Sequence, residues 1–267
     1  MDAPLDFFVH IPKTAGLTML GILRDVYPPE SILSLRGVAE SKRPALLAAA
    51  PKNIRVVAGH VHSNFARHLP RPYRTFTILR EPIDRVLSLY YFVAREKGMG
   101  NHGAVVRGEL TIDEMALRHG SMQARYVAGY EPAAVVSDDQ LLREARTALA
   151  EKMATFGLTE RFDESLLLFN AALGWNVRGY HRENVTRKRP QPVAIDPANL
   201  EIVRQHCAVD CEFYEFARVL FERRLAEQSP DFAERLAALR RGIKTKQRFR
   251  FAHAGMRLIR RTLGIAN

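Results

Sequence analysis

Blocks of apolar and polar positions along the chain predict an α/β fold. Four short apolar runs are typical of buried parallel strands, at residues 6–11, 54–58, 74–79 and 155–158. Four longer segments have apolar side chains at helical spacing, at residues 17–26, 83–95, 138–153 and 163–173. Helical patterns dominate from Asp196 onward. Strands that alternate with helices predict a mostly parallel central sheet flanked by helices, followed by a helical C-terminal part.

Length and charge divide this chain of 267 residues into a body and a tail. A 47% hydrophobic content is enough for one α/β domain with a substantial core. Residues 235–267 hold ten Lys and Arg and no Asp or Glu, while the remainder holds 30 basic against 29 acidic residues. We therefore expect a domain over residues 1–234 and a basic, helical tail over residues 235–267. The nearly neutral body argues against nucleic acid as a partner.

Within the tail, residues 249–263 form an amphipathic pattern. Five apolar side chains fall on one helical stripe: Phe249, Ala252, Met256, Ile259 and Leu263. A basic helix of this kind can lie on an anionic membrane surface, which makes peripheral membrane contact one interpretation. Two alternatives are that the stripe packs on the body and that the arginines attract an acidic acceptor.

Other features favour a cytoplasmic protein, in which membrane contact would be on the inner face. No run of 18 apolar residues occurs, and the first residues lack the pattern of a signal peptide. The two cysteines, Cys207 and Cys211, have the spacing of half a metal site but no partner pair nearby. Structural thiols in a reducing compartment are the preferred interpretation, and no metal is expected.

The first motif that carries chemistry is His-Ile-Pro-Lys-Thr-Ala-Gly-Leu-Thr at residues 10–18. It lies between a predicted strand and a predicted helix, where backbone N–H groups and the helix dipole form an anion site. Lys13 adds a charge, and Thr14 and Thr18 add hydroxyl donors. The spacing of a Walker A loop is absent because Lys13 precedes the glycine. An ordinary turn with a surface lysine is the structural alternative.

The second motif is Leu-Arg-Glu-Pro-Ile-Asp-Arg-Val-Leu-Ser-Leu-Tyr-Tyr at residues 79–91. Arg80 follows a predicted strand at its carboxyl end, where open α/β sheets bind ligands. Ser88 lies two turns into the next helix. The guanidinium and the hydroxyl together can hold a second phosphate. Alternatively, Arg80 pairs locally with Glu81 or Asp84.

These two motifs resemble those of the carbohydrate sulfotransferases, in the branch that includes heparan and uronyl 2-O-sulfotransferases and chondroitin/dermatan sulfotransferases. Residues 155–165 and 182–190 are also similar to recurrent segments of this family, and the four segments follow in the family's order. The resemblance implies a P-loop-like, nucleotide-binding sulfotransferase fold. It also implies 3′-phosphoadenosine 5′-phosphosulfate (PAPS) as sulfuryl donor and 3′,5′-ADP as product.

The resemblance also assigns roles to residues. Lys13 would contact the phosphosulfate, with the loop around it formed by Thr14, Ala15, Gly16 and Thr18. Arg80 and Ser88 would bind the 3′-phosphate. The segment Thr186, Arg187 and Lys188 would close over the nucleotide. Residues 120–126 would face the acceptor, where Arg125 could pair with an acidic sugar or simply cap a helix.

The candidate base lies in Ala-Gly-His-Val-His at residues 58–62, directly after a predicted strand. A neutral imidazole suits proton removal from a hydroxyl near pH 7. His60 and His62 point to opposite faces if the backbone stays extended, so one of them would face the sulfur. The resemblance places a catalytic histidine after the equivalent strand, and we favour His60. A purely structural role for both is the alternative.

Together these features predict transfer of a sulfuryl group from PAPS to a hydroxyl of a carbohydrate, such as a glycan or glycolipid. Animal members of the family carry a Golgi membrane anchor, which this chain lacks, so a soluble bacterial enzyme is expected. A nucleotide-dependent kinase of similar topology is one rival, although it needs a Walker lysine and a Mg²⁺-binding carboxylate. A non-catalytic basic adaptor for anionic polymers is the other.

Overall fold

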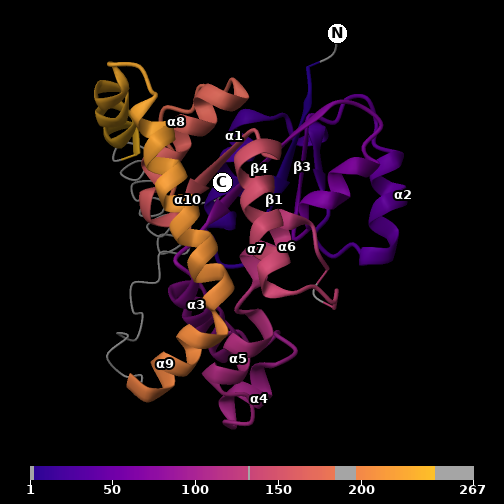
Figure 1. Cartoon of the computed structure of the whole chain (residues 1–267). Helices are drawn as coiled ribbons and strands as arrows, with labels where there is room; N and C mark the ends of the chain where they lie inside the picture. The colour runs from indigo at the N-terminus through magenta and orange to yellow at the C-terminus, as the bar shows by residue number, and fades with distance from the viewer. Residues whose placement is uncertain (1–2, 132, 184–196, 244–267) are drawn as a thin grey trace, which may run out of the picture.

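A five-stranded parallel sheet forms the centre of the computed structural model, which describes residues 3–131, 133–183 and 197–243 (Figure 1). Its strands are β1 (Leu5–Val9), β2 (Ile32–Ser34), β3 (Val56–Gly59), β4 (Tyr73–Leu79) and β5 (Thr155–Leu158). Their order is β2-β3-β1-β4-β5, and every neighbouring pair is parallel. The α/β fold expected from the pattern is confirmed. Strand β2 is the one that the pattern does not predict, because three residues are too few to show a period.

Helices connect and cover these strands. The α-helices of the first half are α1 (Gly16–Val26), α2 (Arg43–Ala48), α3 (Pro82–Arg95), α4 (His102–Val106), α5 (Ile112–His119) and α6 (Met122–Ala128). The later ones are α7 (Asp138–Thr147), α8 (Phe162–Leu173), α9 (Pro197–His206) and α10 (Ala208–Ala226). Short 3-10 or π segments are η1 (Pro29–Ser31), η2 (Glu40–Lys42), η3 (Ser63–His68), η4 (Ala148–Lys152) and η5 (Thr159–Arg161). In the part that the structure describes, none of these helices combines the length and the apolar character needed to cross a membrane.

Alternating side chains of β1 supply the two main cores. Phe8 packs in a cluster with side chains of α1 and α8, such as Leu23 and Phe169. Phe7 and Val9 belong to a second cluster, which α6, α7 and α10 cover. Because successive strand side chains point to opposite faces, a strand that is buried on both faces has consecutive apolar residues, here Phe7, Phe8 and Val9. Asp6 is also buried in this strand, and it pairs with Arg74 at 2.7 Å.

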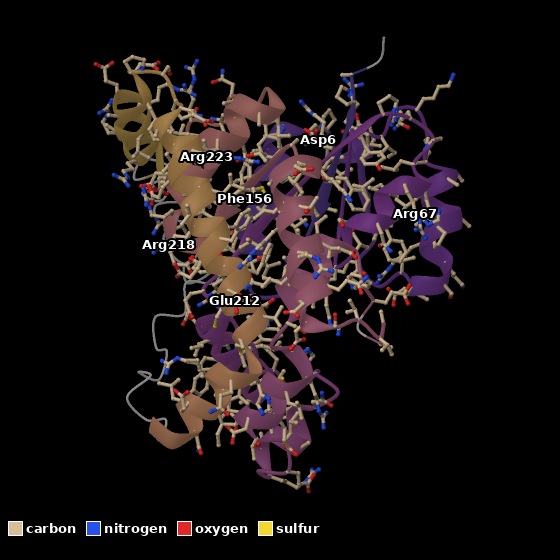
Figure 2. All side chains as sticks on the ribbon, viewed as in Figure 1. Asp6, Arg67, Phe156, Glu212, Arg218 and Arg223 are labelled. Atoms are coloured by element: carbon tan, nitrogen blue, oxygen red, sulfur yellow. The ribbon has the colours of Figure 1, made fainter. Side chains whose placement is uncertain are left out.

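A third cluster lies away from the sheet, where α3, α4, α5 and α9 meet (Figure 1). From this end of the molecule, α10 runs back along the sheet. Its outer face carries charged side chains, including Glu212, Arg218 and Arg223 (Figure 2). Its inner face buries Asp210 and several aromatic side chains. The helix therefore connects the third cluster to the sheet.

The first residues of the basic tail pack on the body of the protein. Residues 232–243 are helical, and Leu239 and Ile243 are buried in the cluster that contains α1 and α8. Arg240 pairs with Asp163 at 3.3 Å. The boundary expected at residue 234 therefore falls within a packed helix. The amphipathic pattern of residues 249–263 lies outside the described residues, as do Thr186, Arg187 and Lys188.

Because Leu239 is only 2% exposed, we expect Leu239→Ala to lower the free energy of unfolding by about 2–5 kcal/mol. Glu234→Ala, at an exposed position of the same helix, should change it by less than about 0.5 kcal/mol. Chemical denaturation of both variants checks this. Equal stability of the two would show that residues 232–243 are not anchored to the core.

Candidate active site

Three motifs that are far apart in the sequence meet at one edge of the sheet. Because all strands are parallel, their carboxyl ends lie at the same edge, and β1 lies between β3 and β4. Val9, at the end of β1, pairs with Gly59 of β3 on one side and with Thr77 of β4 on the other. The loops that follow these strands carry Lys13, His60 and Arg80. In addition, β2 and β3 lie on one side of β1, and β4 and β5 lie on the other. Open α/β sheets bind ligands at such a switch in strand order.

Strained backbone marks the loop between β1 and α1. Lys13 has a φ of 73° and Ala15 a φ of 60°, although neither is glycine. Each non-glycine residue in the left-handed region costs about 1–3 kcal/mol and persists only where its surroundings hold it. The Thr14 hydroxyl between them is buried and donates to the Ile11 carbonyl at 2.9 Å. Alternation of this kind turns successive N–H groups toward one concave side, which suits an anion.

The N-terminus of α1 leaves its first N–H groups without a side-chain acceptor. Among the described residues, no side chain caps it, and its first turn holds no acid. Glu81 caps α3, Thr111 caps α5 and Ser137 caps α7, whereas α8 and α10 lack such a cap but have acids in their first turns. The first N–H groups of a helix need an acceptor, and a bound anion can supply it. This terminus therefore suits phosphate or sulfate.

Gly16 is required by the ring of His10. A Cβ at position 16 would lie 1.6 Å from Nε2 of His10. That ring is confined because it stacks on Phe8 and faces the ring of His60, with centroids 5.3 and 4.1 Å away. Burial, together with the charges of His60 and Arg36, lowers the pKa of His10 to about 3. His10 is therefore a neutral wall of the loop, a role that the sequence pattern does not indicate.

Lys13 is half-buried beside aromatic and basic neighbours. Its Nζ lies 4.0 Å from the centre of the Phe92 ring, in a cation–π contact. Burial, followed by the positive charges of Arg80 and Arg95, lowers its pKa to about 8. A cation that is crowded by other cations is ready to pair with an anion, since the anion relieves the repulsion.

Arg80 reaches across from β4 to this loop. Its Nη1 donates to the Lys13 carbonyl at 2.9 Å, and its Nε donates to Asp84 at 2.8 Å. The local pairing that we considered for Arg80 is thus present, with Asp84 rather than Glu81. Asp84 and Ser88 are four residues apart on α3, so both lie on the helical face next to Arg80. The guanidinium of Arg80 thus contacts the loop that carries Lys13, and the role of Ser88 stays a prediction.

His60 has the protonation geometry of a base. Its Nδ1 lies 2.9 Å from the His10 carbonyl oxygen. Because a carbonyl only accepts, Nδ1 carries the proton and Nε2 of the neutral ring keeps its lone pair. Desolvation lowers the pKa of His60, the bond to the His10 carbonyl opposes this, and the Arg36 charge lowers it further. The residue as a whole is nevertheless exposed.

His62 differs from His60 in its burial and in its hydrogen bonding. It is 3% exposed, and its ring lies edge-on to Tyr126 with centroids 4.5 Å apart. Its Nδ1 has no hydrogen bond within the described residues and lies 3.8 Å from a Glu40 oxygen. Burial, together with the charges of Arg43 and Arg125, lowers its pKa to about 4. The expectation that the two histidines point to opposite faces agrees with these surroundings.

Two side chains of the segment after α5 make their hydrogen bonds within the protein. Arg125 donates to Ser121 at 3.2 Å and to the carbonyls of Glu131 and Ala134 at 3.3 and 3.0 Å. Its guanidinium thus holds the loop after α6, and contact with an acceptor stays a prediction. Gln123, in the segment expected to face the acceptor, is fully buried and contacts the backbone of Arg80 instead. Nothing in the spacing of residues 120–126 indicates this partner.

The remaining parts of the candidate site are Thr18 and the approach to the third predicted segment. Thr18 Oγ1 accepts a hydrogen bond from the backbone N–H of Glu183 at 3.1 Å. The described chain therefore passes the phosphate loop directly before residues 184–196. A pocket of about 710 Å³, lined by Asp25, Trp175 and Arg178 among others, shares no residue with this site. This pocket lies at the C-terminal ends of α1 and α8. Within the described residues, no group of three or more His, Cys, Asp and Glu could hold a metal.

Comparison with known proteins assigns the family. Residues 7–253 match the model of the sulfotransferase family. The chain belongs to the sulfotransferase family. A solved structure similar to this sulfotransferase is that of mouse sulfotransferase SULT7A1 complexed with PAP, at 13% identity and a TM-score of 0.39. The match covers 76% of this chain and 63% of that chain, so the chain spans less than two thirds of the mouse protein. No curated protein matches.

Because of the contact between Gly16 and His10, we expect Gly16→Ala to lower the free energy of unfolding by about 1–3 kcal/mol. Gly21 is the matched control, since it lies in α1 and a Cβ added there would have nothing within 4 Å. Gly21→Ala should raise the free energy of unfolding by about 0.5–1 kcal/mol. Denaturant titration distinguishes the two. Equal or greater stability of Gly16→Ala would contradict the packing described for His10.

Proposed function

We propose that this sulfotransferase moves a sulfuryl group from PAPS to a hydroxyl acceptor, with a carbohydrate as the acceptor class. The observation that carries the proposal is the meeting of three groups at adjacent strand ends. They are the uncapped, strained loop with Lys13, the guanidinium of Arg80, and His60, an exposed residue whose Nδ1 is bonded to the His10 carbonyl. Two cationic groups and one neutral base are what transfer between a nucleotide and a hydroxyl needs.

The nucleotide has two anionic ends, and the site offers two anion-binding positions. The 5′-phosphosulfate would bind to the loop between β1 and α1, through its N–H groups and the residues Lys13, Thr14, Ala15, Gly16 and Thr18. Arg80 and Ser88 suit the 3′-phosphate. PAPS supplies an activated sulfuryl group, so the chain only has to bind, orient and neutralise charge. The segment with Thr186, Arg187 and Lys188 follows Glu183, which contacts Thr18, and we retain it as the part that covers the nucleotide.

In the proposed reaction, Nε2 of His60 accepts the proton of the acceptor hydroxyl while the hydroxyl oxygen bonds to sulfur. The bond between sulfur and the bridging oxygen breaks, and both electrons stay on the 5′-phosphate of 3′,5′-ADP. Lys13 and the N-terminus of α1 stabilise the charge that grows there. His62 is buried against Tyr126, which supports His60 as the base. Arg125 stays a candidate for acceptor binding only if it releases its loop carbonyls.

Two other functions are less well supported. Kinase activity has no Walker lysine to support it, and the family match favours sulfuryl transfer. An adaptor role needs neither an exposed histidine base nor a strained phosphate loop. Acceptor sulfation by the purified protein, followed with labelled PAPS, tests the proposal directly. Glycans, glycolipids and small hydroxyl compounds should be compared as acceptors.

For the nucleotide, we expect 3′,5′-ADP and PAPS to raise the melting temperature more than ATP does, because binding to the native state stabilises it. Arg80→Ala should weaken 3′,5′-ADP binding by about 2–5 kcal/mol, and Lys13→Ala should reduce kcat far more than affinity. Calorimetry with 3′,5′-ADP and 5′-AMP separates these effects. If the intact protein bound both nucleotides equally, Arg80 would not be the 3′-phosphate ligand.

For the base, His60→Ala should reduce kcat by about 10²–10⁴-fold with little change in nucleotide affinity. His62→Ala is the matched control, and it should retain turnover. Because the pKa of His60 is lowered from 6.5, the neutral base persists at mildly acidic pH. The acidic limb of kcat/KM should therefore fall below pH 6.5. Activity lost in His62→Ala and kept in His60→Ala would reverse the assignment.

A further inference from the structure

The backbone of Arg80 is held by a buried side chain of another helix. Gln123 of α6 is 0% exposed. Its Oε1 accepts from the Arg80 N–H at 2.8 Å, and its Nε2 donates to the Arg80 carbonyl at 2.8 Å. The carboxamide thus makes the same donor–acceptor pair that a neighbouring strand would make. It does so one residue after β4 ends at Leu79.

These two hydrogen bonds satisfy backbone groups at the end of β4. Arg80 has left the ladder of the sheet, and Glu81 already caps α3. A backbone N–H and carbonyl that are screened from water both need partners. Only the carboxamides of Asn and Gln offer one donor and one acceptor in a single plane. Gln123 therefore fixes the peptide groups on both sides of the Arg80 Cα.

Gln123 is itself held in place from a third element. The backbone N–H groups of Gln123 and Ala124 donate to the two oxygens of Asp210, at 3.0 and 2.9 Å. Asp210 is fully buried on α10 and lies 3.9 Å from the equally buried Arg85 of α3. The carboxylate caps α6, and its charge is matched by a guanidinium. The carboxamide thus has little freedom to move away from Arg80.

We infer that Gln123 is a positioning residue for nucleotide recognition, whose carboxamide sets the Arg80 backbone so that the guanidinium meets the 3′-phosphate. This inference rests on the proposed function. The guanidinium spans from Asp84 to the Lys13 carbonyl, so a shift of the Arg80 Cα would displace the guanidinium from both of these partners. Small displacements of a charge-assisted contact are costly, because its strength depends on geometry.

The test compares Gln123→Glu and Gln123→Met, which both keep the length of the side chain. Gln123→Glu removes the amide donor, and Gln123→Met removes both polar groups. Thr159→Val is the matched control, because the Thr159 hydroxyl donates to the carbonyl of Leu79, one residue earlier, at 2.9 Å. Affinities for 3′,5′-ADP and 5′-AMP are measured by calorimetry on all folded variants, together with the melting temperature. Both Gln123 variants should lose about tenfold or more of the preference for 3′,5′-ADP. Their affinity for 5′-AMP, like the nucleotide preference of Thr159→Val, should stay near that of the intact protein.

Three outcomes are decisive. If the Gln123 variants keep the preference, or lose affinity for both nucleotides in parallel, the positioning role is wrong. If the intact protein has no preference for 3′,5′-ADP, the proposed function itself fails. Hydrogen exchange of the Arg80 amide in the intact, ligand-free protein gives an answer that no variant's folding can affect. Slow exchange supports the clamp, and exchange as fast as that of an exposed loop refutes it.

Discussion

The parallel direction of all five strands is the constraint on which the candidate site depends. It brings the ends of β3, β1 and β4 to one edge, in that order, so that residues far apart in the chain become neighbours. Parallel strands must be buried on both faces and need long connections. The helices that satisfy these needs are the same ones that carry the site. Thus the uncapped N-terminus of α1 follows the loop of Lys13, α3 carries Asp84 and Ser88, and α6 carries Gln123.

Holding the loop after β1 in a strained form requires several independent contacts. Two left-handed residues, Lys13 and Ala15, cost about 1–3 kcal/mol each. Opposing this cost, Arg80 donates to the Lys13 carbonyl, and Thr14 donates to that of Ile11. The ring of His10 fills the space left by Gly16. Because these contacts come from within the protein, the fold itself orients the N–H groups of the loop, which reduces the entropy cost of binding an anion there.

Sequence patterns could predict what depends on local chemistry. Four of the strands, the major helices, the loop between β1 and α1, and the place of Arg80 at the end of β4 all follow from periodicity and from residue type. What depends on tertiary partners could not be predicted. Gln123 sits on a short helix in a segment without period, and its partner is a backbone group 43 residues away. The roles of His60 and His62 likewise depend on their surroundings, since the bond from Nδ1 to the His10 carbonyl crosses 50 residues. The helical character of residues 232–243 follows from the pattern, whereas the packing of Leu239 and Ile243 against α1 and α8 depends on tertiary partners.

The present partners of Arg80 also bear on how the site would discriminate between ligands. Its guanidinium is bonded to a carboxylate, Asp84, and to a carbonyl, that of Lys13. A phosphate that replaced either contact would gain only the difference between the old and the new interaction. A dianionic 3′-phosphate offers more charge and more acceptor oxygens than Asp84 does, whereas a neutral ribose hydroxyl offers less. The ion pair with Asp84 would thus weaken the binding of every ligand. The effect would be largest for ligands without a 3′-phosphate, because only the phosphate can compensate for the loss of the ion pair.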